Sequence, residues 1–108
     1  MSDLSSFIED KETAYPIVNE ISCYRLVPYY LMSSYLYYKK DKSVLSDEDY
    51  DIMCKRILAE WKQINHPHKK LVKKNALEAG TGYQIRKYPM MTMSAAELWI
   101  EKWEKEIG

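Results

Sequence analysis

The sequence predicts a mainly α-helical fold, a small helical domain that contains an αα-hairpin. Apolar residues recur at spacings of three and four through the middle of the chain, as they do on one face of an amphipathic helix. Ser46 and Ser94 are each followed three positions later by an acid, which is the capping pattern that opens a helix. Polar and apolar residues alternate weakly at 83–88, and one short extended segment does not make a sheet.

Two prolines mark the first helical region. Pro16 and Pro28 can each occupy the first turn of a helix, where the N–H that proline lacks would have no partner. We therefore expect helices over about 16–26 and 28–40, either as two helices or as one kinked rod.

The strongest periodic signal lies in the middle of the chain, after a charged connector at 39–46. Ser46 supplies the N-cap of this helix, and the pattern predicts that it extends over 47–64. Its apolar residues at helical spacing are Tyr50, Met53, Cys54, Ile57, Leu58, Trp61 and Ile64.

The remaining third of the chain is less regular. Pro67 ends the central helix, because proline disfavours helical geometry in the residue before it, and a basic connector follows at 69–74. The capping pattern at Ser94 predicts a C-terminal helix. Near one side of this helix lie Leu98, Trp99 and Trp103.

The composition limits the class of protein. Sixteen basic residues are balanced by sixteen acidic ones, which removes the overall positive field of a stand-alone nucleic-acid binder. Any contact with DNA is therefore expected to be local or indirect, through a partner. The lysine runs at 39–42 and 69–74 are most simply solvated connectors, and they are the clusters able to meet a phosphate.

The sequence also indicates a compartment. The first residues carry acids and lack the apolar run of a signal peptide, and the apolar stretch 21–38 is interrupted by Arg25 and Pro28. We expect no membrane segment. Two distant cysteines offer no disulfide framework, and with the two histidines they lack zinc-site spacing, so we predict a cytoplasmic protein without a metal site.

Aromatic and acidic residues form the candidate binding site. If 28–40 and 47–64 pair as an αα-hairpin, Tyr37 and Tyr38 face the opening turn of the second helix. Asp47, Tyr50 and Asp51 share one side of that turn, because they are three and four residues apart. Tyrosine rings beside carboxylates suit a flat cation, such as the oxidised nicotinamide ring.

At these residues the chain resembles the N-terminal NMN-binding domain of NAD-dependent DNA ligases. That family carries Tyr-His, eight residues, Asp, two residues and Tyr-Asp, and this sequence matches the spacing without a gap. The resemblance implies that the domain binds NAD through its NMN moiety. The implied contacts are Tyr37, Tyr38 in place of the family's histidine, Asp47, Tyr50 and Asp51.

A second resemblance divides the chain into two parts. The segment Pro89-Met90-Met91-Thr92-Met93 is similar to the start of the ligase nucleotidyltransferase domain, which implies that Thr92 and Met93 also contact NAD. On this basis 1–74 is an NMN-binding-like helical domain. The part over 75–108 is an extended segment plus a C-terminal helix that resembles the start of the catalytic domain.

The family's catalytic motif is missing. These ligases attack NAD with the lysine of a Lys-x-Asp-Gly motif, which this sequence does not contain, so we expect no catalytic residue and no ligase activity in the isolated chain. The resemblance implies a recognition module for DNA repair or replication, either a small subunit beside a separate ligase catalytic subunit or a degenerate relative. The alternative is a protein-interaction module, such as a small phage-encoded or regulatory protein, that binds its partner through a surface of tyrosines and tryptophans, which mutation of Trp99 or Trp103 would test.

The candidate residues also have simpler structural explanations. Asp47, Glu48 and Asp49 lie where acids stabilise a helix N-terminus, each by about 0.3–1 kcal/mol. Tyr50 is explained equally well as a core residue with a hydrogen-bonded hydroxyl. The methionines at 90–93 are typical of residues that fill gaps in a core or on a partner surface.

Overall fold

The computed structural model describes residues 18–82 and 84–107. The predicted mainly helical fold is confirmed, and no strand occurs among these residues, including the described part of the expected extended segment, 84–88. The helices are α3 (Cys23–Lys40), α4 (Asp47–Ala59), α5 (Lys74–Ala79) and α6 (Met90–Ile107), with short 3-10 helices η1 (Val18–Glu20) and η2 (Pro67–Leu71).

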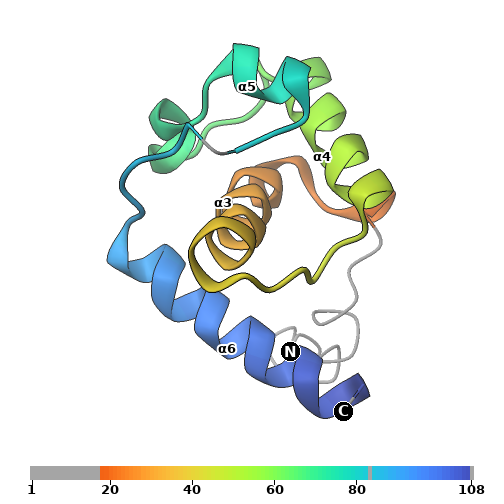
Figure 1. Cartoon of the computed structure of the whole chain (residues 1–108). Coiled ribbons are helices and arrows are strands. Elements are labelled where there is room, and N and C mark those ends of the chain that lie inside the picture. The colour runs from red at the N-terminus through yellow and green to blue at the C-terminus, as the bar shows by residue number, and fades with distance from the viewer. Residues whose placement is uncertain (1–17, 83, 108) are drawn as a thin grey trace, which may run out of the picture.

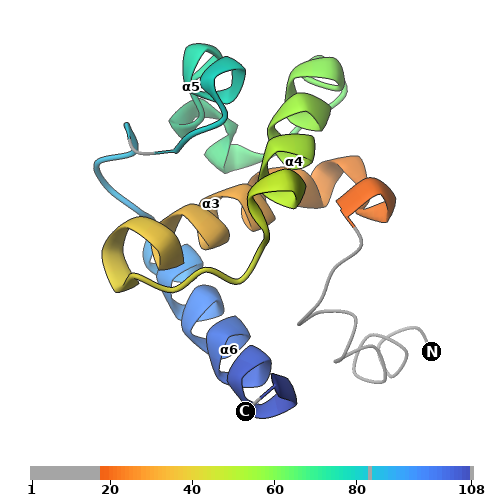
Figure 2. The same cartoon turned by 45° about the vertical axis from the view of Figure 1, so that its right-hand side comes forward.

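Helix α3 lies at the centre of the arrangement. It packs against α4 on one side and α6 on another, while α5 packs against α4. Figure 1 looks nearly along α3, with α5 above it and α6 below. Figure 2 shows α3 from the side, between the α4–α5 layer and α6.

Burial on several sides explains the composition of α3. Its fully buried residues meet those of α4 in one core, in which the largest side chains are Tyr30, Leu26, Leu31, Leu36, Met53 and Ile57. The buried hydroxyl of Ser33 donates to the carbonyl of Tyr30 at 3.2 Å, so the small polar residues of α3 are satisfied within the fold.

The first helical region begins later than expected. A single helix starts at Cys23 and passes through Pro28, so over the described residues the alternative of one rod is correct and that of two helices over 16–26 and 28–40 is wrong. Pro16 lies outside the described residues.

None of the helices within 18–82 and 84–107 has the length and apolar character needed to cross a lipid bilayer.

The capping prediction for α4 is confirmed, and its predicted end is wrong. The Ser46 hydroxyl accepts the N–H of Asp49 at 3.0 Å. The helix ends at Ala59 rather than at residue 64, and turns follow it. The ammonium of Lys69 donates to the carbonyls of Trp61 (2.6 Å) and Ile64 (3.1 Å), so it satisfies acceptors that an α-helix would have used.

The predicted start of α6 is also wrong. The helix begins at Met90, so Ser94 lies inside it rather than at its cap. The N–H of Met93 donates to the carbonyl of Pro89 at 3.1 Å, which shows that the helix starts directly after the proline. Trp99 is 3% exposed and packs edge-on against Tyr29, so most of its side chain belongs to the core.

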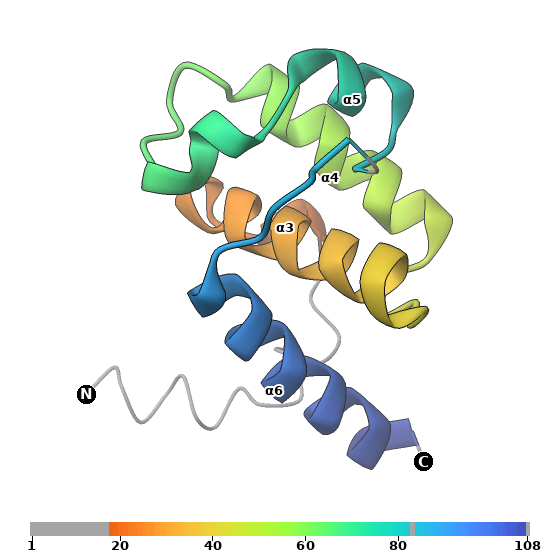
Figure 3. The ribbon, with the colours of Figure 1, turned by 60° about the vertical axis from the view of Figure 1, so that its left-hand side comes forward.

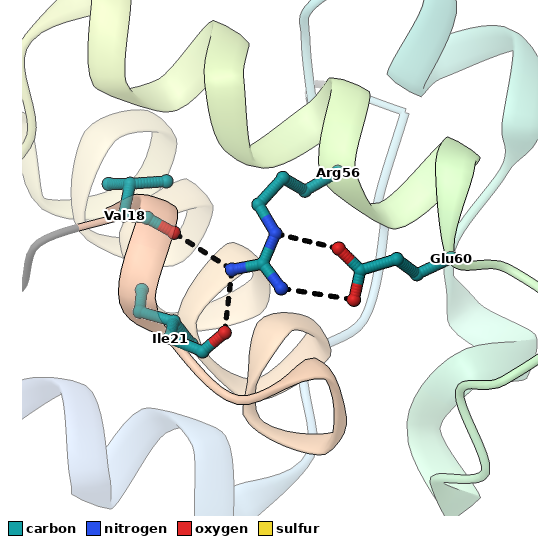
Figure 4. Close-up of polar contacts among 4 residues, drawn as sticks. All are labelled: Val18, Ile21, Arg56 and Glu60. Carbon is teal, nitrogen blue, oxygen red and sulfur yellow. Dashed lines mark hydrogen bonds and ion pairs between the residues drawn. The ribbon is translucent and has the colours of Figure 1, made fainter.

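Arg56 joins the start of the described chain to α4. Its guanidinium donates to both carboxylate oxygens of Glu60, at 2.7 and 3.0 Å. The same group donates to the carbonyls of Val18 (2.9 Å) and Ile21 (2.6 Å), as Figure 4 shows. One side chain therefore satisfies two backbone acceptors and one acid, which positions the segment that precedes α3.

A histidine at the start of η2 predicts a pH dependence of stability. His66 Nδ1 accepts the N–H of His68 at 3.0 Å, so it must be unprotonated. Burial lowers the pKa of His66, and the neighbouring His68 lowers that pKa further. The unfolded chain therefore binds the proton more readily, and stability falls as the pH drops below about 6.5.

The matched variant is His66→Asn, because asparagine can accept the same N–H without titrating. We expect the free energy of unfolding, measured with urea at pH 7 and pH 5, to fall less in this variant than in the wild type. An equal fall in both proteins would contradict the assignment.

Candidate functional site

A surface pocket lies where α3 ends and α4 begins. Its volume is about 120 Å³. Nine residues from α3, the connector, α4 and the end of α5 line it: Ser33, Tyr37, Tyr38, Ser43, Val44, Leu45, Asp47, Tyr50 and Gly80. The expected αα-hairpin is therefore present, and its two helix ends form most of the pocket.

The connector makes a tight turn between the two helices. Asp41 ends α3 in the left-handed region, with φ 57°, and the N–H of Lys42 donates back to the carbonyl of Leu36 at 2.8 Å. This is the usual way to close a helix while reversing the chain. Val44 and Leu45 are buried, so the connector packs against the core where it lines the pocket.

Tyr50 packs against the core with a hydrogen-bonded hydroxyl and also lines the pocket. Its hydroxyl shares a hydrogen bond of 2.7 Å with Ser34, and its ring lies 5.7 Å from that of Tyr30. Burial raises the pKa of Tyr50 well above its usual value, so the hydroxyl stays protonated. Because that hydroxyl is already hydrogen-bonded to Ser34, the ring is the part of Tyr50 that lines the pocket for a ligand.

Tyr37 and Tyr38 form the aromatic rim. Their rings are perpendicular, with centroids 4.8 Å apart, and Tyr37 is 53% exposed. The hydroxyl of Tyr38 shares a hydrogen bond of 2.7 Å with the Thr81 hydroxyl and accepts the N–H of Gly82 at 3.4 Å. Tyr38 therefore lines the pocket while it holds the segment that follows α5.

The two aspartates lie in different positions. Asp47 is exposed and lines the pocket directly. Asp51 does not line it, and its carboxylate forms an exposed ion pair with Lys55 at 2.9 Å. Asp51 nevertheless borders the wall, because its Oδ1 would lie 3.2 Å from a Cβ added to Gly80.

The structure brings four of the seven predicted site residues together. Tyr37, Tyr38, Asp47 and Tyr50 share the pocket, with Asp51 beside it. Thr92 and Met93 do not line it. They belong to the first turn of α6, which packs against a different side of α3 (Figure 2), and Thr92 is buried.

Sequence reasoning missed the part of the wall that comes from beyond α4. Gly80 ends α5 with φ 70°, and this conformation favours glycine. Gly80 after an alanine is a typical end of a helix, but the six-residue α5 before it lacks a clear capping or periodic pattern. The contact of Gly80 with the hairpin depends on tertiary packing alone.

The fold and the pocket define a small helical domain with an aromatic, acid-edged surface site. Comparison with protein-family models, with curated protein sequences and with solved structures finds no match to this chain.

Proposed function

We propose that this pocket binds the pyridinium ring of the NMN half of NAD, in a non-catalytic recognition module similar to the N-terminal domain of NAD-dependent DNA ligases. The observation that carries the proposal is the convergence of Tyr37, Tyr38, Asp47 and Tyr50 on one pocket. These residues are distant enough in sequence that only the hairpin brings them together. A separate ligase catalytic subunit would supply the reactive lysine.

The chemistry of the lining suits a flat cation. The exposed ring of Tyr37 can stack on a pyridinium face, and such contacts contribute about 0.5–2 kcal/mol. The Asp47 carboxylate adds attraction to the positive ring and can accept hydrogen bonds from its carboxamide. The serine hydroxyl of Ser43 is a further polar group of the lining.

The size of the pocket limits what it can enclose. Its volume of about 120 Å³ is below the range of roughly 300–1,000 Å³ that encloses larger ligands. The ring would therefore be bound inside, with the ribose and phosphate at the rim. We expect modest affinity for NMN alone.

Calorimetric titration with NMN tests the proposal. We expect binding of NMN to exceed that of reduced NMN, because only the oxidised ring carries the positive charge that the rings and the carboxylate attract. Tyr37→Ala and Asp47→Ala should each weaken NMN binding by about tenfold or more, which corresponds to about 1.4 kcal/mol.

The control variant is Tyr24→Ala, which removes another exposed tyrosine of α3 that does not line the pocket. It should leave NMN binding unchanged. The absence of measurable heat with folded protein and millimolar NMN would overturn the proposal. Equal binding of oxidised and reduced NMN would remove its cation-based explanation.

A second candidate function is suggested by an apolar groove between α3 and α6. Its volume is about 260 Å³, and its lining includes Leu98, which is 62% exposed. The lining also includes two cations, Arg25 and Lys102. This combination suits an acidic amphipathic helix of a partner protein.

Leu98→Asp tests this candidate against Met90→Asp, which changes another exposed apolar residue of α6 that lies outside the groove. The probe is a labelled synthetic helix with leucines at one face and glutamates beside them, followed by anisotropy. We expect Leu98→Asp to weaken binding at least tenfold and Met90→Asp to leave it unchanged. Equal effects would reject the groove.

A further inference from the structure

The overall charge balance hides a strongly basic segment. From Trp61 to Leu77 the chain contains five lysines, two histidines and no acid. The segment covers the turn after α4, all of η2 and the first four residues of α5. Figure 3 shows α4 and α5 on the side of α3 that faces away from α6.

The fold places two of these lysines over one tryptophan ring. The ammonium groups of Lys69 and Lys74 lie 4.6 and 5.1 Å from the centre of the same Trp61 ring. Lys69 is also held by two backbone carbonyls, as described above. The remaining lysines, Lys62, Lys70 and Lys73, are exposed within this segment.

Three lysines elsewhere on the surface are paired with acids. Lys40 pairs with Glu97 at 3.3 Å, Lys42 with Glu104 at 3.1 Å, and Lys55 with Asp51 at 2.9 Å. Among residues 18–82 and 84–107, by contrast, no ion pair involves a lysine of the basic segment.

The carboxylates that flank the segment do not neutralise it. Glu60 is already bound by Arg56. Glu78 lies after the last lysine, near the end of α5, and forms no ion pair with the described residues. The segment therefore keeps a local positive charge on a chain whose formal net charge is zero.

We propose that the surface of this segment, called here the basic face, binds the phosphate backbone of nucleic acid without regard to base sequence, through its exposed Lys62, Lys70, Lys73 and Lys74. Several exposed ammonium groups within one short segment can replace the counterions of successive phosphates. The contact is independent of the pocket, which lies at the opposite end of α4 from Trp61.

A lipid surface is the less suitable partner. Peripheral membrane helices combine basic residues with apolar side chains that enter the bilayer. None of the large exposed apolar residues in the described part of the chain lies within 61–77, and the half-buried Trp61 has the ammonium groups of Lys69 and Lys74 over its ring. The face therefore offers charge and no large exposed apolar side chain to insert.

Fluorescence anisotropy with a labelled 20-base-pair duplex of mixed sequence tests the proposal. The logarithm of the association constant should fall with the logarithm of the salt concentration, with a slope of about −3 to −4 for four lysines. Lys70→Gln/Lys73→Gln should reduce the size of that slope by about 1.8 and should weaken binding at least tenfold at 50 mM NaCl.

The matched control is Lys39→Gln/Lys105→Gln, which removes the same charge from exposed lysines outside the face. It should change the slope by less than half as much. Equal effects of the two double variants would overturn the proposal, because binding would then follow net charge alone. No binding to the duplex at 50 mM NaCl, or binding to phosphatidylserine vesicles without binding to the duplex, would overturn it as well.

Discussion

Gly82→Ala is expected to lower the free energy of unfolding by about 3 kcal/mol, at the upper end of the cost of overpacking a closely packed site. A Cβ at residue 82 would lie 2.4 Å from Ser34 Oγ and 2.7 Å from the Tyr50 hydroxyl. These two hydroxyls are bonded to each other, so neither can move away without breaking their hydrogen bond. The backbone that follows α5 must move instead.

A double-mutant cycle measured by urea unfolding tests this explanation. Ser34→Ala removes the closest atom, so Ser34→Ala/Gly82→Ala should be more stable than the sum of the two single effects predicts, by about 1 kcal/mol. Additive effects would show that contact with Ser34 is not the cause. The Gly82→Ala variant should also bind NMN more weakly if the pocket has the proposed role, because Tyr50 lines it.

Arg56→Ala is expected to lower the free energy of unfolding by about 2–3 kcal/mol. The substitution leaves Glu60 without its bidentate partner and leaves two backbone carbonyls without a donor. Arg56→Lys should recover only part of the loss, since a single ammonium cannot reproduce the planar guanidinium that bonds both carboxylate oxygens and the backbone.

Lys55→Ala is the control for this prediction. Lys55 precedes Arg56 and also pairs with an acid on α4, but its side chain is 73% exposed, compared with 20% for Arg56. Its loss should cost less than about 0.5 kcal/mol, because solvent screens the pair. A similar small effect of Arg56→Ala would contradict the role assigned to its contacts with Val18 and Ile21.

The candidate site shows what local patterns can and cannot predict. The spacing of Asp47 and Tyr50, together with a capped helix after a short connector, was enough to predict that they face Tyr37 and Tyr38 across a hairpin. The spacing could not predict that Tyr38 would bond to Thr81, because that contact joins residues 43 positions apart. Nor could it separate Asp47, which lines the pocket, from Asp51 beside it.

Some helix boundaries are set by neighbouring residues, and others by contacts from distant parts of the chain. The start of α4 depends on a side chain and a backbone N–H three residues apart, so the sequence alone determines it. The end of α4 depends on Lys69, which reaches back from η2 to carbonyl groups five and eight residues earlier. The start of α6 at Met90 follows Pro89, a local signal that the prediction from the capping pattern at Ser94 did not use.

The sequence by itself determined the helical class, the cap of α4 and the hairpin that forms the aromatic pocket, because each depends on hydrogen bonds or spacings within a few residues. Only the tertiary structure decided that α3 lies between α4 and α6, that Gly80 forms part of the pocket wall, and that Lys69 and Lys74 lie over the ring of Trp61. These features arise from burial and from contacts between distant segments, which no short pattern of residues specifies.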